Sequence, residues 1–270
     1  YIFMTNRKDW KAALSVGFGA MNAETLTELA SAGITEIELS CGQLAPFFEE
    51  MDYPHRSADI SRLAKDNGVN ISSVHLPFAP FGKIDPASLD ADVRAYVVKV
   101  QSELIKAAGA AGVGIAVIHP SGEPYKEEER AARIDVASDV MAKLVDVATE
   151  SGVVIALENI PRTCLCRTHD EMQIFLDRIP NLRVCFDTNH CLIEDNCDYI
   201  RAVGSRIVTL HVSDYDFTDE KHWIPGEGKN DWEGIIRTLE EVDYKGRFLY
   251  ETGGAAKCRE IFANYKQLIG

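Results

Sequence analysis

Short apolar runs alternate with longer amphipathic stretches along most of the chain. The runs have the length and β-rich composition of strands, and they lie at 11–16, 34–39, 71–75, 114–119, 153–158, 182–187, 207–212 and 247–251. The clearest amphipathic stretch is 90–111, where apolar residues recur every three or four positions, as on one face of a helix. Gly112 predicts the end of that helix. The pattern therefore predicts eight strands separated by helices.

Residues typical of helix ends support this division. Segment 127–151 has the same helical spacing. Thr168 and Glu171 form a capping-box pattern that predicts the start of a helix over 168–179. Glycines, which favour the left-handed conformation found after helices, end predicted helices at Gly33, Gly68 and Gly152.

The repeats favour an α/β fold, a single (β/α)8 TIM barrel formed by residues 1–270. Near-continuous apolar strands suit a parallel sheet that is buried on both faces. A length of 270 residues is ordinary for one such barrel, and no Pro/Gly-rich linker marks a second domain. An open, doubly wound sheet is the alternative, but no GxGxxG motif follows the first run, which removes its usual dinucleotide-binding form.

Four consecutive strands in the second half of the chain end in a side chain that can bind a metal. These residues are Glu158, Asp187, His211 and Glu251. In a barrel, the ends of parallel strands and the loops after them form one face, so the four side chains should converge there. Any one of them alone could be a solvated polar strand end. Three carboxylates and one imidazole together favour Mn²⁺, Mg²⁺, Co²⁺ or Zn²⁺.

More histidines gather at the same predicted face. His75 and His119 end the third and fourth strands, and His190 follows Asp187 closely. His222 stands in a loop with two glycines and a proline, whose shaped backbone suits close approach of a polyhydroxy or phosphorylated ligand. His75 and His119, each taken alone, could instead be hydrogen-bonded structural residues.

Weaker candidates for substrate contacts lie nearby. Glu38, near the end of the second strand, could bind a substrate hydroxyl or form a structural salt bridge. Trp223, Phe78 and Phe81 could form an apolar wall for a sugar, or they could pack in a core or lid. Lys83 and Arg162 are candidate partners for a substrate phosphate, with solvated loop charges as the alternative.

Composition indicates which classes of partner and which cellular compartment are favoured. The 28 basic and 42 acidic residues give a net charge of −14, which disfavours nucleic acid unless a local basic patch overrides the overall field. No apolar run reaches the roughly 18 residues of a membrane span. Seven cysteines without paired CxxC spacing indicate reduced thiols in a cytoplasmic protein. Because the sequence begins with Tyr1, a removed signal stays an alternative. A homo-oligomer is left open.

From about residue 11 to 265 the chain resembles the xylose isomerase-like barrel superfamily. That superfamily includes sugar phosphate isomerases and epimerases, inosose-type dehydratases and endonuclease IV. The resemblance rests on ordered motifs: Ala-Leu-Glu158-Asn, Phe-Asp187-Thr-Asn-His190, Leu-His211-Val-Ser-Asp214, His222-Trp-Ile-Pro-Gly-Glu-Gly and Tyr-Glu251-Thr. These motifs are specific for the superfamily but distinguish its members poorly.

Resemblance to the ketose epimerases implies one divalent metal held by Glu158, Asp187, His211 and Glu251. It also implies that the two glutamates act as acid and base on a sugar or sugar phosphate. One would remove the proton next to the carbonyl, the resulting enediolate would be stabilised by the metal, and the other would return a proton. His190 would hydrogen-bond a substrate hydroxyl.

Resemblance to endonuclease IV implies more metal, because that enzyme uses three zinc ions and nine ligands. The matching positions here are His75, His119, Glu158, Asp187, His190, His211, Glu220, His222 and Glu251, with Glu220 where an Asp is expected. One ion is favoured and up to three are allowed. A sugar isomerase or epimerase is the favoured function. A dehydratase acting on a polyol or keto acid, an abasic-site nuclease and a non-catalytic ligand-binding barrel are the alternatives.

Overall fold

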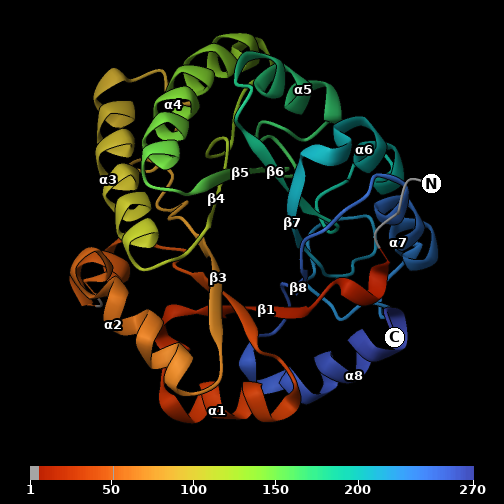
Figure 1. Ribbon diagram of the computed structural model, residues 1–270. Coiled ribbons are helices and arrows are strands. Elements are labelled where there is room, and N and C mark those ends of the chain that lie inside the picture. The colour runs from red at the N-terminus through yellow and green to blue at the C-terminus, as the bar shows by residue number, and fades with distance from the viewer. Residues whose placement is uncertain (1–5, 51) are drawn as a thin grey trace.

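Eight parallel strands form a ring, and helices surround it (Figure 1). The structure, a computed structural model, describes residues 6–50 and 52–270. The strands are β1 (Ala12–Gly17), β2 (Glu36–Ser40), β3 (Asn70–His75), β4 (Ile115–Ile118), β5 (Val154–Glu158), β6 (Arg183–Asp187), β7 (Ile207–His211) and β8 (Phe248–Tyr250). They are hydrogen-bonded in the order β7-β6-β5-β4-β3-β2-β1-β8, and a parallel bridge between Val212 and Tyr250 joins the two ends. The predicted TIM barrel is confirmed.

Helices occupy the connections between strands. They are α1 (Ala23–Ala32), α2 (Tyr53–Asp66), α3 (Ala91–Ala110), α4 (Arg130–Glu150), α5 (His169–Arg178), α6 (Asn196–Val203), α7 (Trp232–Glu241) and α8 (Cys258–Leu268). Short 3₁₀ turns lie at Arg7–Asp9, Phe18–Ala20, Glu127–Glu129, Gly204–Arg206 and Ala255–Lys257, and a π-helical turn at Pro46–Glu50. Within the described residues, none of these helices combines the length and apolarity needed to cross a membrane.

The predicted helix ends agree closely with the observed ones. Gly33 has a φ of 100° after α1, in the left-handed region that glycine adopts readily. The helix predicted from residue 127 begins as a 3₁₀ turn and becomes α4 at Arg130. Thr168 caps α5 by accepting from the Glu171 N–H, while the Glu171 side chain binds Arg130 at 2.6 Å. Thr168 therefore caps α5, and Glu171 links α5 to the start of α4.

Alternation along each strand separates the apolar core from the polar interior of the barrel. In β5, Ile155 and Leu157 pack in the core shared with the helices, so Ala156 and Glu158 take the opposite face. The same two-residue period places Asp187 two positions after Cys185, which packs with Ala156 inside the ring. In β5 and β6 the inward face is therefore apolar at mid-strand and becomes ionisable at its end.

Gly109 lies where α3 meets the end of α4. A Cβ added there would overlap the backbone carbonyl oxygen of Ser151. Alanine is usually about 1 kcal/mol better than glycine inside a helix, but a clash with backbone cannot be relieved by turning a side chain. Gly109→Ala is therefore expected to lower the free energy of unfolding, measured in urea, by about 1–3 kcal/mol. Gly114→Ala, whose Cβ meets nothing within 4 Å, is the control. Equal stability of the two variants would contradict this packing.

Candidate functional site

The four strand-end residues predicted as metal ligands converge around one nitrogen, Nδ1 of His211. Glu158 Oε1 lies 2.8 Å from it, Glu251 Oε2 3.4 Å and Asp187 Oδ2 3.8 Å. One ligand atom from each of the four residues lies within 4.8 Å of the others. Glu158, Asp187 and His211 are buried, whereas Glu251 is partly exposed and lines a cavity. The residues form a compact, oxygen-rich group that is open on one side.

Asp187 shows why this group suits a cation. Its Oδ1 accepts a hydrogen bond from the Asn189 N–H at 2.5 Å. Its Oδ2 is buried and has no hydrogen-bond partner among the described residues. Burying such an oxygen costs free energy, because it loses its hydrogen bonds to water and gains none from the protein. A divalent cation bound by the four ligands would satisfy it.

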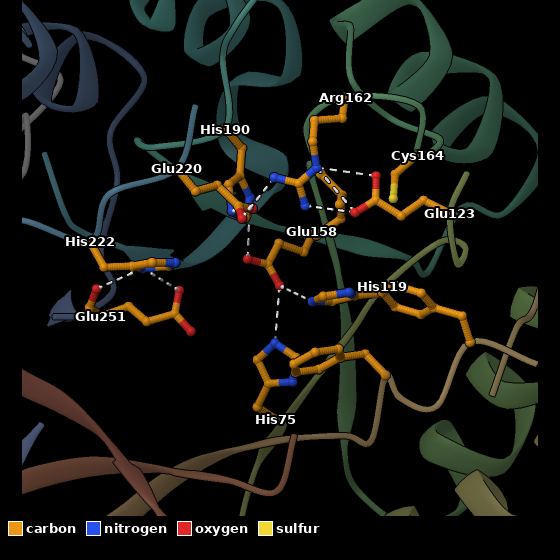
Figure 2. Close-up of a pocket in the computed structure, with 13 residues that line it drawn as sticks. His75, His119, Glu123, Glu158, Arg162, Cys164, His190, Glu220, His222 and Glu251 are labelled. Carbon is orange, nitrogen blue, oxygen red and sulfur yellow. Dashed lines mark hydrogen bonds and ion pairs between the residues drawn. The ribbon is translucent and has the colours of Figure 1, made fainter. Parts of the chain in front are cut away.

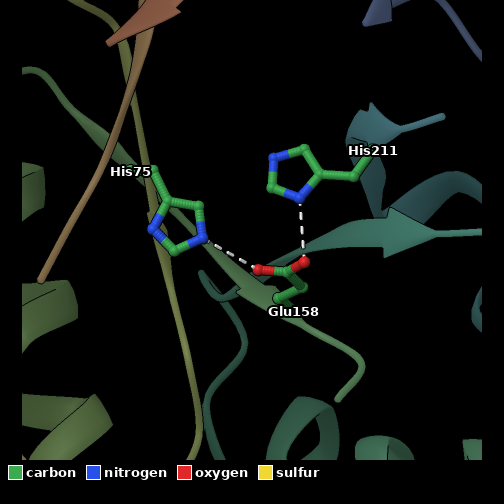
Figure 3. Close-up of side chains that lie close together, drawn as sticks. All are labelled: His75, Glu158 and His211. Atoms are coloured by element: carbon green, nitrogen blue, oxygen red, sulfur yellow. Dashed lines mark hydrogen bonds and ion pairs between the residues drawn. The ribbon is translucent and has the colours of Figure 1, made fainter. Parts of the chain in front are cut away.

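Glu158 also belongs to a second, overlapping group. Its Oε2 lies 3.1 Å from Nε2 of His75 and 3.3 Å from Nε2 of His119, while Oε1 faces His211 (Figure 3). Nδ1 of His75 donates to the Leu76 carbonyl oxygen at 2.9 Å, which leaves Nε2 to face the carboxylate. His75, Glu158 and His211 have the spacing of a cation site that shares two residues with the first.

His190, Glu220 and His222 line the same cavity (Figure 2). Nε2 of His190 lies 2.9 Å from Glu220 Oε1. His222 places Nδ1 3.1 Å from the Glu251 carbonyl oxygen. Across residues 6–50 and 52–270, these three do not form a further group of metal-ligand spacing. The structure thus gathers the nine positions suggested by the endonuclease IV resemblance, but it supports two overlapping groups rather than three.

Asn159 fixes the end of β5 to the end of β6. Its side-chain oxygen accepts from the Asp187 N–H at 2.7 Å, and its amide donates to the Asp187 carbonyl oxygen at 2.9 Å. Its own carbonyl oxygen accepts from Nδ1 of His190 at 2.7 Å. Asn159 directly follows Glu158 in one of the motifs, but its bridging role appears only once the two strands are adjacent.

The loop after β7 is built around the buried carboxylate of Asp214. This carboxylate accepts from the Gly226 N–H at 2.8 Å and from the Trp232 indole at 2.9 Å. Gly228 passes so close that a Cβ there would overlap the same carboxylate. Because the loop is held in this way, His222 reaches the cavity with a left-handed backbone, φ 50°.

Arg162 joins three loops above the cavity. Its guanidinium donates to Glu123 at 2.7 Å and to Asp219 and Glu220 at 2.9 Å each. Glu123 follows β4, Arg162 follows β5, and the two other carboxylates follow β7. Figure 2 shows Arg162 between Glu123 and Glu220. We call these four residues the loop clasp. Sequence reasoning missed Glu123 because no strand-end pattern marks it.

Burial and neighbouring charge shift several pKa values in this site. Burial by itself would raise the pKa of Glu158, but attraction to His211 and hydrogen bonds from nearby imidazoles hold it well below its usual range. Burial raises the pKa of Asp187 to about 7, and the nearby Glu251 carboxylate adds to the rise. Burial opposes protonation of His190, yet attraction to Asp187 and the hydrogen bond to Glu220, together with the charge of Glu158, outweigh it and raise that pKa to about 10. Negative charge is therefore concentrated around two imidazoles.

The cavity above these residues has a volume of about 150 Å³ and an apolar wall. Phe78 belongs to that wall and stacks on His119, with ring centroids 4.4 Å apart. Trp223, which is 37% exposed, and Lys83 do not line this cavity. Glu38 is fully buried and contacts His211 on the side away from it. Of the weaker candidates for substrate contact, Phe78, Phe81 and Arg162 line the space that a ligand would occupy.

A family model described as xylose isomerase-like TIM barrel matches residues 26–268. The chain belongs to this family. The resemblance found in the sequence motifs is thereby confirmed. Because one barrel fold can carry many different activities, family membership does not specify the reaction. The reaction depends on the residues of the site.

The relatives that match the sequence include one that is named as a sugar 3-epimerase. The chain is 27% identical over 203 residues to an uncharacterized protein of Methanocaldococcus jannaschii, covering 71% of this chain and 69% of that one. It is 29% identical over 135 residues to an L-ribulose 3-epimerase of Methylomonas sp., a match that spans 48% of this chain and 44% of that enzyme.

Solved structures with the same fold carry similar names. A D-tagatose 3-epimerase-like protein superposes with a TM-score of 0.76 at 22% identity, covering 95% of this chain and 97% of that one. A D-psicose 3-epimerase gives a TM-score of 0.77 at 19% identity, covering 96% and 99%. At these identities the likeness establishes the fold alone.

Divalent cations are expected to stabilise the folded chain. A ligand that binds only the folded state adds about 2.7 kcal/mol at one hundred times its Kd. Mn²⁺ or Co²⁺ should therefore raise the Tm of chelator-treated protein in calorimetry. Asp187→Asn should remove most of this shift, whereas Glu194→Gln, which alters a carboxylate bonded to His169, should retain it. An undiminished shift in Asp187→Asn would contradict the assignment of this ligand.

Proposed function

We propose that this chain is a divalent-metal-dependent isomerase that epimerises a small, unphosphorylated sugar at the carbon next to its carbonyl. The observation that carries the proposal is the placement of Glu158 and Glu251. Their carboxylates reach the same nitrogen of His211, at 2.8 and 3.4 Å, from strands separated by β6 and β7. Family membership and the sugar 3-epimerases among its relatives support this function.

Epimerisation needs two proton-transfer groups because the carbon is inverted. A proton must leave one face of the carbon and another must arrive on the opposite face. Two carboxylates carried by β5 and by the end of β8 can flank a substrate bound between them. A positioned carboxylate typically contributes about 10²–10⁴-fold as a general acid or base.

In the proposed reaction, one glutamate accepts the proton from the carbon next to the carbonyl. The electrons of the broken C–H bond form a carbon–carbon double bond, and the carbonyl electrons move onto oxygen. The other glutamate, in its protonated form, delivers its proton to the opposite face as the carbonyl re-forms. The first glutamate then gives up its proton and the second takes one up, which restores the starting state. Glu251, which is partly exposed, can exchange protons with solvent in this step.

A divalent cation held by Glu158, Asp187, His211 and Glu251 would polarise the carbonyl and offset the negative charge that develops on its oxygen. His190 lines the cavity, and its Nδ1 is held by the Asn159 carbonyl oxygen. Its Nε2 would donate to a substrate hydroxyl in place of Glu220, which lies 2.9 Å from it. Phe78 offers an apolar surface for the carbon chain.

The charge of the cavity favours a neutral substrate. Glu123, Glu158, Glu220 and Glu251 line it, and Arg162 is the one Lys or Arg among its described lining residues. The Arg162 guanidinium is already engaged by carboxylates of the loop clasp. A phosphate would therefore meet four carboxylates without a free Lys or Arg to pair with it. The same shortage of Lys and Arg disfavours nucleic acid, which needs phosphate contacts.

Solvent deuterium is expected to enter the substrate at the carbon next to the carbonyl. The test is incubation with D-tagatose, D-psicose and L-ribulose in D₂O, followed by NMR. Glu158→Gln and Glu251→Gln should each slow this exchange by about 10²–10⁴-fold, since each lacks one proton-transfer group. Glu150→Gln, at the exposed end of α4, is the control.

Full exchange in either glutamate variant would overturn the two-carboxylate mechanism. An unsaturated ketone formed with loss of water would assign the site to a dehydratase instead.

A phosphorylated sugar is expected to be the poorer substrate. For whichever ketose is turned over, its phosphate ester should show a kcat/KM at least about tenfold lower, because like charges are brought together in the cavity. Steady-state kinetics on matched pairs at constant ionic strength would measure the difference. Preference for the phosphorylated member would contradict the assignment of a neutral substrate.

A further inference from the structure

The imidazole of His211 is held by carboxylates on both of its nitrogens. Nδ1 faces the cation-binding group and lies 2.8 Å from Glu158 Oε1. Nε2 faces the opposite way, toward the barrel interior, and donates to Glu38 Oε1 at 2.9 Å. Both His211 and Glu38 are fully buried. Water therefore cannot replace either contact.

Three adjacent strands prepare the position of Glu38. In the sheet register Glu38 of β2 pairs with Ser15 of β1 on one side and with Ser73 of β3 on the other. The Ser73 hydroxyl donates to Glu38 Oε2 at 2.9 Å, and the Ser15 hydroxyl donates to Oε1 at 3.4 Å. The register between β2 and β3 shifts at Ile37 and Glu38, an irregularity of the kind that re-aims side chains in sheets. Ser15 and Ser73 thus hold the Glu38 carboxylate in a position that faces His211.

Among the described residues, His211 is the one imidazole that hydrogen-bonds Glu38, while His75 is near enough for the Glu38 charge to raise its pKa. The hydrogen bonds to its carboxylate come from Ser15, Ser73 and His211. It does not line the cavity, so it lies behind the imidazole rather than beside a substrate. Burying a carboxylate is expensive unless it is hydrogen-bonded and matched by charge. The fold nevertheless places one directly behind the histidine ligand.

We propose that Glu38 is a positioning residue for the cation site. By accepting the Nε2–H of His211, it holds the ring in one orientation and one tautomer, in which the Nδ1 lone pair points at Glu158, Asp187 and Glu251. Ser15 and Ser73 hold Glu38 in turn. A carboxylate behind a histidine ligand also makes the imidazole a stronger donor to the metal. This inference rests on the proposed function, because it requires that His211 bind a cation.

The test compares Glu38→Gln with the wild-type protein by isothermal titration with Mn²⁺ after chelator treatment. Loss of such an outer carboxylate typically weakens metal binding about 10–100-fold, and a weakening of that size is expected here. Glu36→Gln is the matched control. Glu36 lies on the same strand and is also buried, but it bonds Asn70 and Arg247 rather than His211. Its variant should bind Mn²⁺ like the wild type.

A second measurement separates positioning from general stability. In Zn²⁺-saturated protein, the proton on Nε2 of His211 should give a low-field NMR signal because a carboxylate accepts it. Glu38→Gln should shift that signal upfield, and Glu36→Gln should leave it in place. If Glu38→Gln does not fold, Ser73→Ala replaces it: loss of one donor to Glu38 should weaken Mn²⁺ binding by a smaller factor.

The outcomes distinguish this inference from the proposed function. A wild-type protein that binds no divalent cation would overturn the metal-dependent function itself. A wild-type protein that binds Mn²⁺, with equal affinity and an unshifted signal in Glu38→Gln or unaltered affinity in Ser73→Ala, would overturn the role of Glu38 alone.

Discussion

Several carboxylates are buried around a single imidazole, that of His211. The arrangement of the residues at the C-terminal ends of the strands depends on how this negative charge is offset. Three carboxylates approach Nδ1 of His211 within 3.8 Å, and a fourth lies 2.9 Å from Nε2. In a low-dielectric interior such crowding is unfavourable unless positive charge or hydrogen-bond donors offset it. The histidines around Glu158, the backbone N–H at Asp187 and the serines at Glu38 each supply part of that offset. The remaining orphaned oxygen of Asp187 marks where it is incomplete.

The barrel itself was predictable from the sequence because its causes are local. Buried parallel strands require continuous apolar runs, and the eight runs identified lie within two residues of the observed strand ends. The convergence of Glu158, Asp187, His211 and Glu251 followed from the same logic. Residues at corresponding ends of neighbouring parallel strands have to meet at one mouth, whatever the details of the loops.

Features that depend on contacts between loops or on register were not predictable in this way. Arg162 was considered as a phosphate partner, and only the fold shows that Glu123, Asp219 and Glu220 already occupy it. Glu38 was placed at the mouth from its position near a strand end. Its side chain instead lies behind His211, since the register of β2 and the burial of that layer determine where it points.

The sharing of residues between the two candidate cation groups has a thermodynamic consequence. Glu158 and His211 belong to both groups, so the ligands of one cannot be rearranged without altering the other. Occupation of one group would change the affinity of the second by a coupling free energy, and reciprocity requires the effect to be equal in both directions. A chain with this geometry therefore cannot hold two ions as independent sites. The number of ions that it binds therefore depends on how Glu158 and His211 are shared between the two groups.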